Sequence, residues 1–221
     1  MPGRLGVKGT VSGISALVLV LLALTWRAVP HTAFYERNLP WIIARSAGLA
    51  ALVLLAGLVV LGTLMSHPIN RAFWKQTKSM LVWHRYLSTF VFAFVLVHIV
   101  AIVMDKYAHV SIIGALVPGQ AGYRATAVAL GTVALYAMAL TALSASYAQK
   151  LPPKLWLYIH RGAMLVFALA WTHGMLSGSD SIALRFMYFG LAGIVLAAGG
   201  TRYWLEMPQR RKAAPAGGKR V

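Results

Sequence analysis

The sequence predicts an all-α membrane protein: a six-transmembrane-helix bundle with both termini in the cytoplasm. Hydrophobic residues make up 59% of the 221 residues and charged residues only 11%, whereas a soluble domain carries about 25% charged residues. The apolar residues gather in runs long enough to cross the hydrocarbon core, which takes about 20 helical residues. The basic residues gather in alternate loops, as the positive-inside rule requires of a multi-pass protein.

Six apolar runs, separated by charged residues or by proline and glycine, are the predicted spans: 11–29, 41–65, 82–104, 124–147, 155–177 and 183–206. A cytoplasmic N-terminus (1–10) precedes this helical region (11–206), and a basic cytoplasmic tail (207–221) follows it. Arg4 and Lys8 precede the first run, as they would precede a signal peptide. No A-x-A cleavage site follows that run, so we expect a retained helix.

The charge distribution sets the predicted orientation. Fifteen of the 21 Lys and Arg residues lie in the N-terminus, the second and fourth loops and the tail, and the other six lie on the opposite side. The opposite side also holds three of the four acidic residues: Glu36, Asp105 and Asp180. The first side is therefore expected to be cytoplasmic. This asymmetry accounts for the net charge of +17 without nucleic acid as a partner.

Four of the seven histidines lie within predicted spans: His84 and His98 in the third, His160 and His173 in the fifth. Both spans run from the cytoplasm outward, so each contributes one early and one late histidine. Spacings of 14 and 13 residues correspond to ~21 and ~20 Å along a helix. If the two helices face each other, two stacked sites follow, with one histidine from each helix at each depth. Such pairs suit the axial positions of a haem iron, whereas zinc requires four ligands at one point.

The helical geometry fits the third span better than the fifth. Fourteen residues rotate ~1400°, within ~40° of four turns, so His84 and His98 share a face. Thirteen residues leave His173 ~140° away from His160 on an ideal helix. We therefore expect a π-bulge or a tilt in the fifth span.

Other residues near these histidines have two possible roles each. Arg85 and Arg161 each follow an early histidine, where they can bind haem propionates or extend to the cytoplasmic interface as ordinary basic residues. Gly48, Gly131 and Gly162 can admit a flat macrocycle or allow close helix packing. The chain has no cysteine, which excludes iron–sulfur clusters, thiolate metal sites and covalently attached c-type haem.

At these histidines the sequence resembles the ferric-reductase-type transmembrane domain family. That family includes the membrane portions of NADPH oxidases and the haem-binding subunit of the periplasmic methionine sulfoxide reductase system. The resemblance covers roughly 40–206. It depends on H-x₁₃-H in the third span and H-x₁₂-H in the fifth, and on the stretches ARSAGLAALVLL, WHRYLS and THGMLSGSDS.

The resemblance implies two b-type haems, a place in a bacterial inner membrane among its lipids, and electron transfer across that membrane. His84 and His160 would bind the cytoplasmic-side haem, and His98 and His173 the outer one. The presence of His84 favours a generic diheme member over the methionine sulfoxide reductase subunit.

No flavin- or nicotinamide-binding segment is recognisable after the last span. A flavin is thus expected only through a partner, and the donor is a separate cytoplasmic flavin reductase, a diffusible reduced flavin or a quinol. The acceptor, a protein or a small molecule, would meet the outer loop around Tyr107, His109 and Tyr123.

Two rival functions stay open. One is a quinol-oxidising cytochrome b subunit of a respiratory or dehydrogenase complex. The other is a transporter whose histidines relay protons or ions, although proline, which often interrupts transporter helices, is absent from the middle of every predicted span. A structural assembly subunit would not require four aligned histidines.

Overall fold

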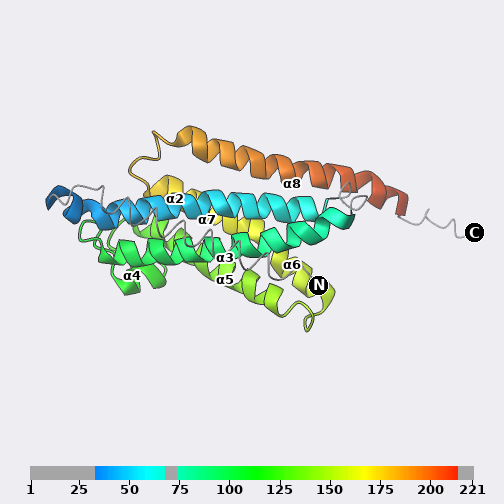
Figure 1. Ribbon diagram of the computed structural model, residues 1–221, viewed down its shortest axis with the longest axis horizontal. Coiled ribbons are helices and arrows are strands. Elements are labelled where there is room, and N and C mark those ends of the chain that lie inside the picture. Colours follow the sequence, from blue (N-terminus) through cyan, green and yellow to red (C-terminus); the bar gives the residue numbers. More distant parts are fainter. Residues whose placement is uncertain (1–32, 68–73, 214–221) are drawn as a thin grey trace, which may run out of the picture. The chain divides into compact units, whose positions relative to one another are not determined.

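The computed structural model describes residues 33–67 and 74–213, and these residues form helices and connecting turns without a strand (Figure 1). The helices are α2 (Ala33–Met65), α3 (Trp74–Met104), α4 (Ile112–Leu116), α5 (Ala125–Ser146), α6 (Pro153–Arg161), α7 (Ala163–Ser177) and α8 (Arg185–Ala213). The predicted N-terminus (1–10) and first span (11–29) lie outside the described residues. The all-helical fold class agrees with the prediction.

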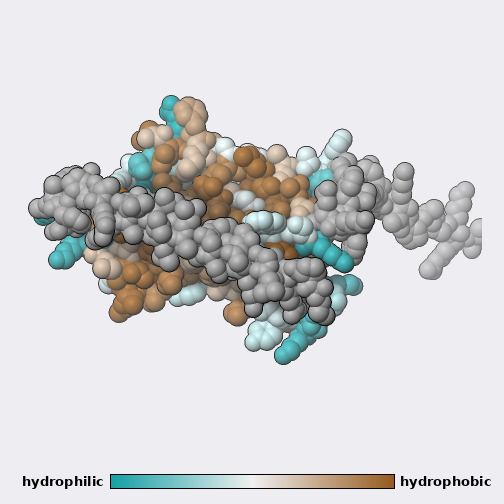
Figure 2. All heavy atoms as spheres, in the orientation of Figure 1, coloured by the Kyte–Doolittle hydropathy of each residue, from teal (hydrophilic) through white to brown (hydrophobic). Residues whose placement is uncertain are grey.

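Four segments are long and apolar enough to cross a membrane: Arg37–Met65, Lys78–Met104, Ala125–Ser146 and Pro153–Ser177. They correspond to the second through fifth predicted spans. Hydrophobic side chains occupy the middle of the visible face of the described helices, and hydrophilic ones lie mostly toward its ends (Figure 2). The sixth predicted span corresponds to α8, which is not among the four. Because α8 continues to Ala213, the first residues of the predicted tail are helical.

The chain divides into two compact units, Met1–Leu39 and Pro40–Val221. The described part of the first unit is helical from Ala33. All four histidines of the predicted sites belong to the second unit, so both sites are described within it.

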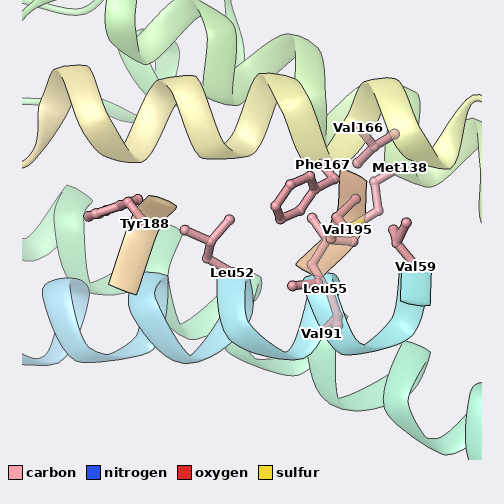
Figure 3. Close-up of a cluster of buried hydrophobic side chains, with 10 residues drawn as sticks. Leu52, Leu55, Val59, Val91, Met138, Val166, Phe167, Tyr188 and Val195 are labelled. Carbon is pink, nitrogen blue, oxygen red and sulfur yellow. The ribbon is translucent and has the colours of Figure 1, made fainter. Parts of the chain in front are cut away.

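The core of the second unit is a cluster of apolar side chains contributed by five helices (Figure 3). Val91 of α3 and Tyr188 of α8 are each only 1% exposed. Around them lie Leu52, Leu55, Ala56, Val59, Met138, Val166, Phe167 and Val195. In sequence, Val91 lies midway between His84 and His98, and Phe167 lies between His160 and His173. The cluster therefore lies between the two levels at which the histidines occur.

The fifth predicted span is broken into two helices at Gly162. The amide of Gly162 donates to the carbonyl of Ile159 (2.9 Å), three residues back, so the turn is tighter than α-helical. A Cβ at Gly162 would lie 2.8 Å from the same carbonyl oxygen. This break lies between His160 and His173. It is a 3₁₀-type turn, where the sequence led us to expect a π-bulge or a tilt.

The outer loop 105–123 contains the short helix α4 and packs against α5. The hydroxyl of Thr132, which is buried, donates to the carbonyl of Ala115 (2.9 Å), and the Tyr136 hydroxyl donates to the carbonyl of Leu116. The buried carboxylate of Asp105 accepts bonds from the amides of Tyr107 and Ala108. The loop is thus an ordered element at the C-terminal end of α3 and the N-terminal end of α5.

Candidate functional site

The two late histidines lie next to each other. The ring centroids of His98 and His173 are 6.2 Å apart, and the ring planes cross at 80°. His98 comes from α3 and His173 from α7, as the sequence predicts for the outer pair. Two helices that are distant in the sequence thus place one imidazole each at this site.

Each outer imidazole is held by a backbone carbonyl of a neighbouring helix. Nδ1 of His98 lies 2.6 Å from the carbonyl oxygen of Ala44 on α2. Nδ1 of His173 lies 2.8 Å from that of Ala127 on α5. Because a carbonyl only accepts, each Nδ1 carries the proton and donates. This bond fixes the tautomer and leaves Nε2 of each ring as the nitrogen available to a metal.

The two early histidines form a second pair, whose ring separation is nearly the same. The ring centroids of His84 and His160 are 6.1 Å apart, with an interplanar angle of 59°. The indole of Trp156, one turn earlier on α6, stacks on His160 at 5.3 Å and 17°. Nδ1 of both inner histidines is buried without a hydrogen-bond partner. The backbone of Thr141 on α5 interacts with the His160 ring, but its carbonyl lies outside hydrogen-bonding geometry for Nδ1.

Glycines of neighbouring helices lie directly against three of the four imidazoles. A Cβ added at Gly48 would lie 2.9 Å from His98, at Gly62 3.2 Å from His84, and at Gly131 2.7 Å from His173. The rings of His98 and His173 would have to shift if these glycines were alanines, and the His84 ring would be crowded. The glycines therefore determine how closely α2 and α5 approach the histidines of α3 and α7.

Gly62 is a site residue that the sequence reasoning missed, although the sequence carries a signal for it. Gly48 and Gly62 are 14 residues apart on α2, as His84 and His98 are on α3. Gly48 backs the late histidine and Gly62 the early one, which is the order that antiparallel helices require. An equal spacing of glycines on one span and histidines on the next predicts this arrangement.

The outer site also has a charged neighbour that the sequence reasoning did not identify. Arg45, next to Ala44 on α2, interacts electrostatically with both His98 and His173. Its guanidinium forms an ion pair with Asp180, in the turn after α7, and lies against Gly178. Arg45 therefore links α2 to the chain that follows His173.

Two side chains that directly precede α5 cap the end of α7. The hydroxyl of Tyr123 donates to the carbonyl of Ser177 (3.2 Å), and the guanidinium of Arg124 donates to that of Leu176 (2.5 Å). The last carbonyls of a helix lack partners within the helix, so these bonds stabilise its end. They hold the last turn of α7, which begins at His173.

Arg85 and Arg161, which directly follow His84 and His160 in the sequence, are exposed, and their binding to haem propionates stays a prediction. His67 is buried at the end of α2, and His109 has a left-handed backbone with φ of 49° in the outer loop. His31 lies outside the described residues.

Each site offers two ligands for a metal. No group of three or more His, Asp or Glu side chains suited to a metal ion gathers within 33–67 or 74–213. Imidazole nitrogens lie roughly 2.0–2.1 Å from a bound metal, so two rings on opposite sides of one ion have centroids about 6 Å apart. The centroid separations of 6.1 and 6.2 Å agree with this value. The residues present therefore fit a bis-histidine haem at each level.

The chain was compared with protein families and with known proteins. The family model described as "Ferric reductase like transmembrane component" matches residues 47–171, more than half of the chain. This range includes α3, α5 and α6 and ends two residues before His173. No curated protein and no solved structure matches the chain. The match and the four apolar helices identify an integral, multi-pass membrane protein. The chain belongs to the ferric reductase-like transmembrane family, and this membership indicates a function in membrane electron transfer.

Proposed function

We propose that this protein is a diheme b-type cytochrome that transfers electrons across the membrane from a cytoplasmic-side donor to an outer-side acceptor. One observation carries the proposal: two pairs of imidazoles, from the same two spans, have centroid separations of 6.1 and 6.2 Å. The match to a ferric reductase-like family supports the same function.

The residues of the chain would bind and orient the two groups. His84 and His160 would ligate the inner iron, and His98 and His173 the outer iron. The carbonyls of Ala44 and Ala127 hold the outer rings in one tautomer with Nε2 free. Haem iron, when bound, supplies the one-electron redox chemistry. The protein supplies ligands, their orientation and a water-excluding environment.

The packing between the levels favours electrons over ions. The cluster between the two pairs consists of apolar side chains together with the buried Tyr188, and includes Val91, Leu55 and Phe167. An ion or a chain of water molecules would need polar groups along this path, because an unsatisfied polar group in an apolar interior costs several kcal/mol. An electron needs no such groups. The cluster thus supports the cytochrome over the histidine-using transporter.

The proposed direction depends on the predicted topology of six spans with cytoplasmic termini. With that topology, the His84/His160 level lies nearer the cytoplasm. The electron donor would be a separate flavin reductase or a quinol, and the acceptor would meet the outer loop 105–123.

A difference spectrum and a haem count test the proposal. The protein is purified in detergent, the dithionite-reduced minus oxidised spectrum is recorded, and haem is measured per chain as pyridine haemochrome. We expect two b haems per chain. A haem-free chain from cells supplied with haem would refute the cytochrome, and one haem per chain would refute the diheme arrangement.

A further inference from the structure

The inner site contains a hydrogen-bond donor that the described protein does not use. The indole Nε1 of Trp156 is buried and has no hydrogen-bond partner among the described residues. A buried N–H without a partner is destabilising, because it has lost its hydrogen bonds to water and gained none in the protein. The outer site differs, because both of its ring Nδ1–H groups donate to carbonyls. The described residues of the inner site therefore leave this donor without an acceptor.

The position of Trp156 connects this donor to the proposed inner haem. Trp156 and His160 are four residues apart on α6, so their side chains lie on one helix face. Their rings stack nearly parallel, with centroids 5.3 Å apart. Side chains on a helix lean toward its N-terminus, so the indole lies on the Pro153 side of the His160 ring. In the predicted topology this is the cytoplasmic side of the inner site.

The charges at this end of the protein favour an anionic acceptor. Lys154 and Arg161 lie on the same short helix, and Arg85 directly follows the inner ligand His84. Neither of the two described stretches that contain these cations, Lys78–Met104 and Lys150–Ser177, has an Asp or a Glu. An ionised carboxylate only accepts hydrogen bonds and is stabilised by cationic neighbours. Haem carries two such groups, its propionates.

We infer that Trp156 is a binding residue of the inner site, whose indole N–H donates to a propionate carboxylate of the haem held by His84 and His160. The inference rests on the proposed function. The stack holds the indole beside the His160 ring, where its N–H would help to orient the bound haem. Trp156 would act on the inner haem alone.

Two substitutions separate the indole N–H from the stack. Trp156→Phe keeps an aromatic ring beside His160 but removes the donor, and Trp156→Leu removes both. Trp171→Phe is the matched control, because the Trp171 N–H already donates to the carbonyl of Tyr188 (2.8 Å). All variants are made in the full-length protein. The inner haem is identified as the one that His84→Ala eliminates.

The rate at which the inner haem transfers to apomyoglobin is the first measurement. Losing a hydrogen bond to a charged group should accelerate this transfer about tenfold or more in Trp156→Phe. The midpoint potential of the inner haem should also fall, because the propionate charge is less compensated and stabilises the ferric state. Trp171→Phe should change neither quantity. A Trp156→Phe protein that matches wild type in both would overturn the inference, even if Trp156→Leu loses haem.

A second measurement tests the carboxylate itself and separates its loss from a folding defect of the variant. Wild-type apoprotein and the Trp156→Phe apoprotein are each reconstituted with haem dimethyl ester, in which both propionates are blocked. We expect the difference in transfer rate between the two proteins to disappear. A difference that persists unchanged would overturn the carboxylate as acceptor. Failure of the proposed function would look different, because wild type would then bind no haem.

Discussion

The two histidine pairs have similar spacing, yet different atoms hold them in place. The outer rings donate to the carbonyls of Ala44 and Ala127, and glycines lie directly behind both. The inner rings lack these bonds, and His160 is stacked on Trp156 instead. A hydrogen bond from the second ring nitrogen makes a ligating imidazole more basic. The two proposed haems should therefore differ in electronic environment, although histidines would ligate both.

Replacing one outer histidine should remove one haem and leave the other. In His98→Ala or His173→Ala, the proposed outer haem would lose one of the two histidines that hold it, while the inner pair keeps both. We expect one haem per chain by pyridine haemochrome and one step instead of two in a redox titration. His109→Ala is the control, because His109 lies in the loop 105–123 and belongs to neither pair. Two haems retained in both outer-site variants would contradict the assignment of these ligands.

A single methyl group behind His173 should have a similar effect. The Cβ of Gly131→Ala would lie 2.7 Å from Nδ1 of His173, where it would displace the ring and break its bond to Ala127. We expect Gly131→Ala to lose the outer haem. Gly57→Ala is the matched control, because a Cβ there meets nothing within 4 Å. Equal haem content in the two variants would show that the close approach of α5 is not required.

At the scale of elements, the helices and the histidine pairs could be predicted, but the details that fix them could not. The spacing of His84 and His98 matches four helical turns, so their common face was predictable. The spacing of His160 and His173 does not match, and the sequence alone could not show that a tight turn at Gly162 lies between them. The partners Ala44 and Ala127 were also not predictable, because every residue has a carbonyl. Only the packing of the helices decides which carbonyl a histidine reaches.

The loop 105–123 contains a helix that the sequence reasoning did not predict. This helix is α4, with Ser111 as N-cap accepting a bond from the amide of Gly114 (3.0 Å). Thr132 directly follows Gly131 in the sequence. Its hydroxyl donates to the carbonyl of Ala115, near the end of α4. The loop and the outer site therefore share a segment of α5.

Removing this link should lower stability. Thr132→Val keeps the side-chain shape but leaves the buried carbonyl of Ala115 without its donor, which should cost about 1–3 kcal/mol in the free energy of unfolding. We expect a Tm lower by several degrees in detergent. In the control Thr172→Val, the lost bond runs only to Ala168 on the same helix, so the Tm should hardly change. Equal Tm values for Thr132→Val and wild type would show that α4 is not held by this bond.

At the scale of the whole molecule, the function depends on what separates the two sites. The levels are ~21 Å apart along α3, and the space between them contains the apolar cluster around Val91 and Phe167. Close packing of this kind leaves no room for a continuous chain of water. The protein would therefore let electrons pass between two fixed positions while it keeps protons and metal ions from crossing.

Reconstituted vesicles should show this separation of electrons from ions. Vesicles that carry the protein are loaded with ferricyanide, and dithionite is added outside. The enclosed ferricyanide should be reduced and its colour lost, whereas protein-free vesicles should keep the colour. Because each electron carries charge across the bilayer, valinomycin with potassium should accelerate the loss by compensating that charge. The His98→Ala protein, with its outer site incomplete, should insert into the vesicles and leave ferricyanide oxidised.

The same vesicles should keep an imposed pH gradient as long as protein-free vesicles do, which a pH-sensitive dye inside them reports. The apolar cluster predicts this result, because a proton path needs hydrogen-bonding groups at each step across the interior. If wild-type protein collapsed the gradient and His98→Ala did not, the histidines would lie on a proton path, and the transporter would replace the cytochrome. If both proteins collapsed it, the packing between the sites would not form the barrier that separates electron transfer from ion movement.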